Sequence, residues 1–200
     1  HRVRLSVERG AGSVVEPGTR MLAPRTTRGN TPEIPLRRRF PVDMLGFMDG
    51  LAEVQRLLEI STDRDNPKAE ELEQLLDAAQ HIAVVGVSRD PEKPARRVPS
   101  YLALKGYDVI PVNPNAGRIL GREAFPTLEE VPPPIDIAVM FRPSATVGGF
   151  VTAAMEREEQ VAIWLQPGIR SDTEIAEARA RGFTAVQDLC VFQVHRALHG

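Results

Sequence analysis

Short apolar runs and longer amphipathic stretches alternate along most of the chain. The short runs are rich in Val, Ile and Ala and lie at 81–85, 108–112, 136–141, 161–165 and 183–187. Each run is too short for a helix and lacks a polar face, which is typical of a strand buried on both faces. We therefore expect five strands, and buried strands of this kind predict a mostly parallel sheet.

Apolar residues at helical spacing fill most of the segments around these strands. They predict helices at 51–58, from Asn66 to Ala79, 94–105, 144–155, 171–181 and 188–198. Gly106 and Gly182 are natural stops for two of them. Residues 117–126 look irregular, and 127–131 could form one helical turn. The pattern predicts an α/β fold, namely a Rossmann-like three-layer parallel sheet with helices on both faces.

The pattern also divides the chain. Residues 1–49 show no sustained period and hold nine Arg against five acidic residues. We expect them to be a disordered tail or a leader that is not part of the native protein. Residues 50–66 read as a helical lead-in, and the Rossmann-like domain is expected to span 67–200.

Composition narrows the function. The net charge is −2, so the chain has no overall basic field for nucleic acid. No stretch approaches the roughly 18 apolar residues of a membrane span. A single cysteine, Cys190, excludes an internal disulfide and suits a reducing compartment, so we expect a cytoplasmic protein. His195 and His199 lack ligand partners at metal spacing, and no catalytic Ser-His-Asp or Cys-His set is indicated.

Candidate chemistry lies where the predicted strands end. The first strand leads directly into Gly86-Val87-Ser88, a glycine turn before a helix. Such a turn presents backbone N–H groups to an anion. In open parallel sheets, ligands bind beyond the carboxyl ends of the strands. The topology therefore selects the segments 86–88, 113–115, 141–144, 166–168 and 188–190.

Several nucleotides could fit this edge. The dinucleotide fingerprint needs three spaced glycines and an acidic residue after the second strand, whereas this chain has Gly86 alone and Asn113 there. The Walker pattern for ATP is absent. Three basic residues nearby suit a ligand with several phosphates: Arg96, Arg97 and Arg118.

A series of motifs runs in order along the domain: Val85-Gly86-Val87-Ser88, Arg97-Val98 with Tyr101-Leu102, Gly106-Tyr107, Pro111-Val112-Asn113-Pro114, Leu120-Gly121, Phe141-Arg142, Gln166-x-Gly168 and Asp188-x-Cys190. Together they resemble the small stand-alone CoA-binding domain proteins. These are similar to the nucleotide-binding domain of the succinyl-CoA synthetase alpha subunit. The resemblance covers roughly residues 70–198.

The resemblance implies that coenzyme A or an acyl-CoA is the ligand. The residues that would line the phosphates are Gly86, Val87 and Ser88, with Arg96, Arg97 and Arg118 as basic residues nearby. Those that would border the adenosine are Asn113, Pro114, Phe141, Arg142, Pro143 and Ser144. Gln166 and Gly168 would meet the pantetheine arm. The synthetase's catalytic histidine lies in a second domain without a counterpart here, so the resemblance implies binding without ligase chemistry.

Two other functions stay open. One is an NAD(P)-dependent oxidoreductase with an atypical glycine turn, and the other is an interaction domain with a vestigial crevice. Asp at position 113 should repel the ribose phosphate of CoA but help to bind NAD. An acyl-transfer enzyme or a second copy of the chain is a candidate partner of a CoA-binding module.

Overall fold

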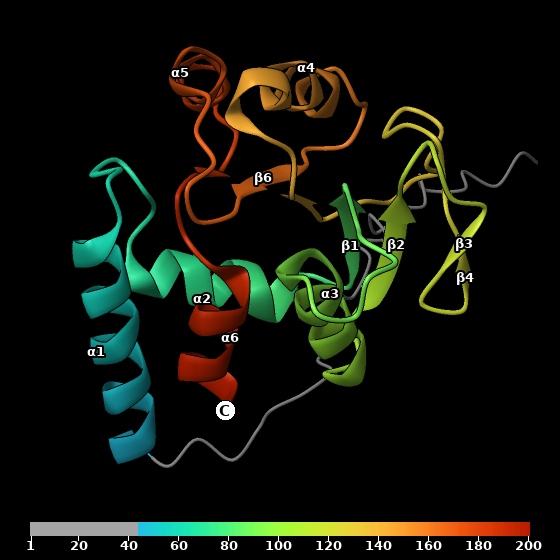
Figure 1. Cartoon of the computed structure of the whole chain (residues 1–200). Coiled ribbons are helices and arrows are strands. Elements are labelled where there is room, and N and C mark those ends of the chain that lie inside the picture. The colour runs from blue at the N-terminus through green and yellow to red at the C-terminus, as the bar shows by residue number, and fades with distance from the viewer. Residues whose placement is uncertain (1–43) are drawn as a thin grey trace, which may run out of the picture. The chain divides into compact units, whose positions relative to one another are not determined.

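The computed structural model describes residues 44–200, and the main sheet there consists of parallel strands in the order β2-β1-β5-β6-β7 (Figure 1). Their bounds are β1 (His81–Val85), β2 (Asp108–Val112), β5 (Ile137–Met140), β6 (Ala162–Leu165) and β7 (Ala185–Val186). The predicted fold class is confirmed. The last strand is shorter than its apolar run, since only two of its residues pair with β6.

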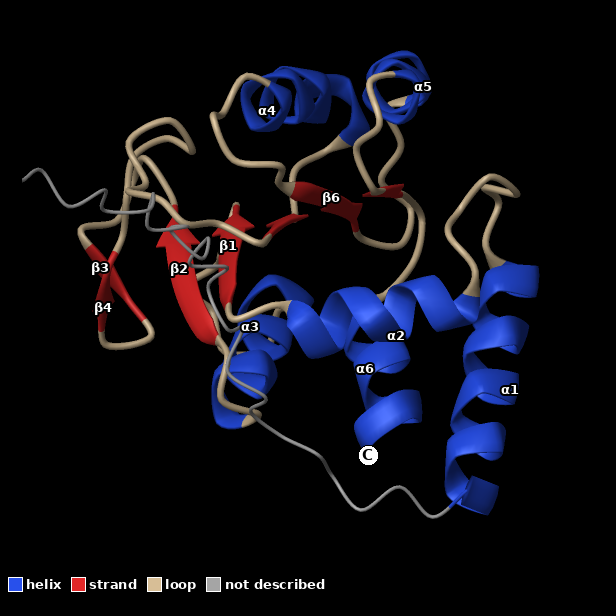
Figure 2. Ribbon diagram, turned by 180° about the vertical axis from the view of Figure 1, so that it is seen from behind, coloured by secondary structure: helices blue, strands red, loops and turns tan. Residues whose placement is uncertain are grey.

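Helices cover both faces of this sheet, as Figure 2 shows from behind. On one side lie α4 (Ser144–Met155) and α5 (Asp172–Ala180). On the other side lie α1 (Met44–Ile60), α2 (Ala69–Ala78), α3 (Pro94–Leu104) and α6 (Val191–His199). These elements belong to one compact unit.

The central strand β1 explains the two layers. Ile82 and Val84 pack in the core beneath α2, α3 and α6, whereas Ala83 and Val85 pack in the core beneath α4 and α5. All four side chains are at most 1% exposed. Successive residues of a strand point to opposite faces, so an uninterrupted apolar run gives one core on each side.

The connection from β2 to β5 differs from the others because it contains no helix. It holds a small antiparallel ribbon, β3 (Arg118–Ile119) with β4 (Arg122–Glu123). Leu120 and Gly121 turn the ribbon with φ angles of 59° and 73°. The sequence indicated irregular structure here, because a left-handed leucine is uncommon and two-residue strands carry no periodic pattern.

Helix α2 begins later than its sequence suggests. Its N-cap is Lys68, whose backbone N–H donates to the Glu71 carboxylate at 2.7 Å. The predicted cap, Asn66, uses its side chain elsewhere: its amide donates to the Gln187 carbonyl at 2.9 Å and its oxygen accepts from the Gln187 N–H. The residue that resembled a helix cap fastens the chain to the end of β7.

Helix α1 packs closely against α6. A Cβ on Gly50 would lie 2.7 Å from the Ala197 carbonyl oxygen, so the two helices approach at a position where only glycine fits. Val54 is fully buried in the same layer. The sequence analysis placed residues 1–49 in a tail or leader, but α1 begins at Met44, so residues 44–49 are helical. The rest of that expected segment, residues 1–43, lies outside the described residues.

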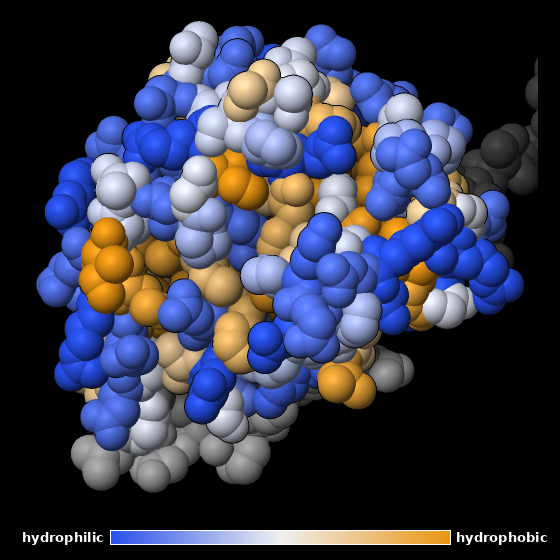
Figure 3. Space-filling model, in the orientation of Figure 1, coloured by the Kyte–Doolittle hydropathy of each residue, from blue (hydrophilic) through white to orange (hydrophobic). Residues whose placement is uncertain are grey.

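The surface in the orientation of Figure 3 is mostly hydrophilic, with apolar groups between the polar ones. Among the residues that the structure describes, the large apolar side chains that are strongly exposed are Met48, Ile60 and Leu104. No helix within residues 44–200 has the length and apolar character that a membrane crossing needs.

His195 is a buried titratable residue of α6. It is 4% exposed, and the Tyr101 hydroxyl lies 3.0 Å from its Nδ1. Burial, and then the nearby His199 and Lys105, lower the pKa of His195 to about 4. The neutral ring is therefore the form that the fold accommodates, and its Nδ1 can accept a hydrogen bond from the Tyr101 hydroxyl.

This burial predicts a pH-dependent stability. Between pH 6.5 and about 4 the unfolded chain binds a proton at His195 that the folded chain does not, so the free energy of unfolding falls as the pH falls through this window. The loss at this residue is up to about 3 kcal/mol. Urea unfolding of the wild type and of His195→Gln from pH 7 to 4.5 measures it. The variant should show a shallower slope, and equal slopes would contradict the assignment.

Candidate functional site

The strand order places a switch point between β1 and β5. From β1 the chain moves to β2 on one side, then crosses to β5 on the other and continues outward. Ligands of such sheets bind beyond the carboxyl ends of the strands at this point. The residues that follow the two strands are Gly86 and Phe141, both among the predicted ligand-binding residues.

Gly86 lies in a tightly packed turn. Its N–H donates to the Val112 carbonyl at 2.9 Å, and the Phe141 N–H donates to the Val85 carbonyl at 2.8 Å. A Cβ on Gly86 would lie 2.8 Å from both the Phe141 oxygen and the Arg142 Cδ, and its φ is +84°. The glycine is therefore required by the close approach of β5 as well as by its left-handed backbone.

Ser88 is fastened to helix α3 through a proline. Pro99 lies inside that helix and has no N–H to give to the carbonyl of Ala95, four residues earlier. The backbone N–H of Ser88 donates to that carbonyl instead, at 3.0 Å. The Ser88 hydroxyl accepts from the Asp90 N–H. Pro99, which disfavours a helix, thus leaves the Ala95 carbonyl free to accept from Ser88 in the glycine turn.

Asn113 holds two loops in place. Its amide nitrogen donates to the Val87 carbonyl at 2.8 Å, and its oxygen accepts from the Asn115 N–H at 2.8 Å. Pro114 beside it is exposed. Because both polar atoms of the Asn113 side chain are engaged, Asp at this position would break the bond to Val87 with any ligand. The substitution therefore does not discriminate CoA from NAD.

Arg142 is a basic residue in contact with the glycine turn. Its side chain packs across Gly86, and its guanidinium lies 5.6 Å from the centre of the Phe150 ring. The buried Nε has no hydrogen-bond partner, and Arg142 forms no ion pair with any described residue. An unpaired guanidinium of this kind is suited to a phosphate.

A second group of predicted residues lies at the ends of β5 and β6. The Ser144 hydroxyl lies 3.5 Å from the Gly168 carbonyl and accepts from the Arg170 N–H at 2.9 Å. Gln166 is 3% exposed, and its side-chain nitrogen has no partner within residues 44–200. A buried amide donor without an acceptor is costly unless a ligand or water satisfies it. Pro143, before the helix, is exposed.

The other three predicted basic residues lie on α3 and on the β3–β4 ribbon. Arg96 is half-buried and Arg97 is exposed, both in the first turn of α3. Arg118 lies on the β3–β4 ribbon, where its guanidinium donates to the Gly121 carbonyl at 2.7 Å. Arg118 is therefore occupied in stabilising the ribbon turn.

Asp188 lies in segment 188–190, which the topology selected, but the sequence analysis gave its side chain no role in the site. It follows β7 with a φ of 54°, and its carboxylate accepts from the Gly168 N–H at 2.7 Å. Burial raises the pKa of Asp188, but the hydrogen bonds from Gly168 and Thr62 outweigh it and lower the pKa. The carboxylate stays ionised and holds the Gly168 turn. Within the described residues, no cluster of His, Cys, Asp or Glu could hold a metal ion.

The comparisons with known proteins identify the family of the domain. Residues 80–196 match a family described as the CoA binding domain. The chain belongs to this CoA-binding domain family. The resemblance that the sequence motifs indicated is confirmed.

The relatives include a small protein that the match covers almost completely and a ligase that it covers in small part. An uncharacterized protein of Bacillus subtilis, YneT, is 33% identical over 130 residues, which cover 65% of this chain and 96% of YneT. An ADP-forming acetate–CoA ligase of Archaeoglobus fulgidus is 27% identical over 95 residues, 46% of this chain but 14% of the ligase. A solved structure from Thermus thermophilus is 35% identical with a TM-score of 0.62, covering 66% of this chain and 99% of that one.

The crowding at Gly86 gives a prediction for the CoA-binding domain. Gly86→Ala should lower the free energy of unfolding by about 1–3 kcal/mol, since it forces a left-handed alanine against Phe141 and Arg142. Urea unfolding measures the loss. Gly121→Ala is a control with positive φ but no atom within 4 Å of the new Cβ, and Gly117→Ala has open space too. A loss at Gly86 no larger than at Gly121 would contradict the close packing.

Proposed function

We propose that this chain binds coenzyme A or an acyl-CoA at the carboxyl ends of β1, β5 and β6, and that it carries out no ligase chemistry of its own. The proposal depends on one observation: Arg142 packs on the glycine turn at the switch point and has no ion-pair partner among the described residues. The family match supports CoA as the ligand.

The two groups of site residues suit the two halves of such a ligand. Beside Gly86, Arg142 offers positive charge to phosphates, and Arg97 in the first turn of α3 is an exposed second cation. At the end of β6, the Gln166 amide offers a buried donor to a carbonyl group, and the pantetheine arm of CoA carries amide carbonyls. The ligand would therefore run from the β1 turn toward the Gly168 turn.

The proposal is limited to binding because the chain spans only 14% of the ligase that it resembles. The cytoplasm is the expected compartment, since one cysteine in 200 residues suits a reducing environment. An acyl-transfer enzyme or a second copy of the chain is the partner we expect for a module that holds CoA.

Isothermal titration of the full chain with CoA, acetyl-CoA, NAD, NADP and ATP tests the function. We expect saturable binding of CoA or acetyl-CoA and none of comparable strength with NAD. Binding of NAD without CoA would overturn the proposal in favour of an oxidoreductase. Binding of none of the five would favour an interaction domain with a vestigial crevice.

Arg142→Gln tests the anchoring cation. We expect it to weaken CoA at least tenfold, because a charge-assisted hydrogen bond to phosphate contributes about 1.5–3 kcal/mol. The matched control is Arg56→Gln on α1, whose guanidinium pairs with Glu53 on an exposed surface. Equal affinities for Arg142→Gln and the control would show that Arg142 does not bind the ligand.

A further inference from the structure

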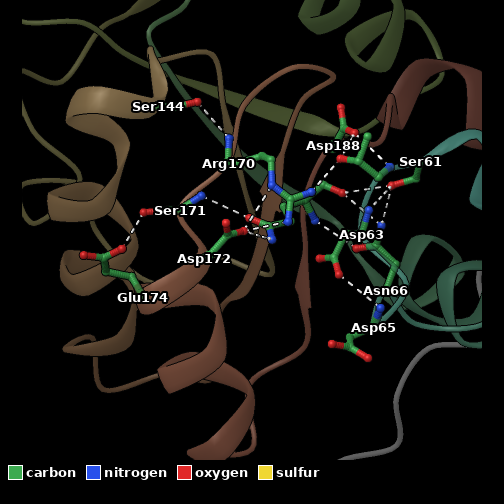
Figure 4. Close-up of polar contacts among 12 residues, drawn as sticks. Ser61, Asp63, Asp65, Asn66, Ser144, Arg170, Ser171, Asp172, Glu174 and Asp188 are labelled. Carbon is green, nitrogen blue, oxygen red and sulfur yellow. Dashed lines mark hydrogen bonds and ion pairs between the residues drawn. The ribbon is translucent and has the colours of Figure 1, made fainter.

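Residues 61–66, the first part of the connection from α1 to α2, precede the part of the chain that matches the family. They nevertheless contact residues that follow β6 and β7 (Figure 4). The backbone N–H of Thr62 donates to Asp188 Oδ2 at 3.0 Å, and the Thr62 hydroxyl donates to the same oxygen. These bonds join positions 126 residues apart in the sequence.

Asp188 transmits this contact to the candidate site. While Oδ2 accepts from Thr62, Oδ1 accepts from the Gly168 N–H at 2.7 Å. Both Asp188 and Gly168 have left-handed backbones, with φ of 54° and 74°. Left-handed conformations are costly for a residue other than glycine and persist only where the surroundings fix them. Thr62 supplies part of that fixation.

A third contact completes the arrangement. The Arg170 guanidinium donates to the Thr62 hydroxyl oxygen and also binds the Asp172 carboxylate. The hydroxyl therefore accepts from a cation and donates to an anion, an arrangement in which each hydrogen bond polarises the next. Arg170 also links to Ser144 through its backbone N–H. The loop after β6 is held from both sides.

The face of Gly168 toward which a side chain would point is open, with no atom within 4 Å of a Cβ built there. A ligand can approach this turn directly, in contrast to Gly86, whose Cβ position is crowded by Arg142 and Phe141. Loop 61–66 therefore contacts the turn through Asp188 while leaving the open side of Gly168 free.

We propose that Thr62 is a positioning residue for the ligand site: its hydroxyl, held between Arg170 and Asp188, fixes the Gly168 turn against which CoA binds. The inference rests on the proposed function. It assigns a role in binding to a segment that lies outside the family domain. A turn that is already fixed spares the ligand the entropy of ordering it.

The test compares CoA affinities of the full-length wild type, Thr62→Val and Thr62→Ser by titration at 15 °C. Valine removes the hydroxyl and keeps the shape, and we expect it to weaken CoA about five- to tenfold. Serine keeps the hydroxyl and should bind within about twofold of the wild type. Thr127→Val is the matched control, because the Thr127 hydroxyl bonds only to Glu130 in the loop before β5.

The backbone amide of Gly168 supplies a readout that a general loss of stability would not move. In NMR spectra of the ligand-free protein, its proton resonance should shift in Thr62→Val and return in Thr62→Ser, while Thr127→Val leaves it unchanged. Wild-type affinity in Thr62→Val, or an unmoved Gly168 resonance, would overturn the inference. Absence of CoA binding in the wild type would overturn the proposed function instead, whatever the resonance does.

Discussion

The close approach of β5 to the end of β1 is the constraint on which the site depends. β1 pairs with β2 and β5 in register, so the three strands end at one level. At that level Gly86 lies under the Phe141 carbonyl and the Arg142 side chain, with no space for a Cβ. This contact aligns the turn with Arg142. A bulkier residue would separate the strands at the switch point, where Asn113 also bonds to Val87.

The fold was predictable because its strongest signal is local. Each central strand is an apolar run, and burial on both faces follows from its position between two helical layers. The β3–β4 ribbon could not be found in this way, because its turn depends on Leu120 in a left-handed conformation that leucine seldom adopts. Asn66 resembled a helix cap because its neighbours fit that pattern, whereas its partner, Gln187, is 121 residues away.

The candidate site was predictable to the extent that topology selects it. Gly86, Phe141 and Gly168 follow strands of one parallel sheet, so the strand order alone places them at the same edge. Topology also selected Asp188, but not its role, and Thr62 and Arg170 could not be identified. A contact between distant segments leaves no periodic or local motif. Asn113 has a structural role that the sequence did not indicate: its side chain bonds to Val87 and Asn115 and holds the two loops together. Its contact with a ligand stays a prediction.

Pro99 weakens one element and thereby orders another. By removing a hydrogen bond from α3, it leaves the Ala95 carbonyl to the backbone N–H of Ser88. Because this link joins two backbone atoms, it does not depend on the side chains of residues 89–93. The same link sets a limit on engineering: replacing Pro99 to strengthen the helix would give the Ala95 carbonyl a competing donor, so that a more stable α3 would come with a looser turn at residues 86–88.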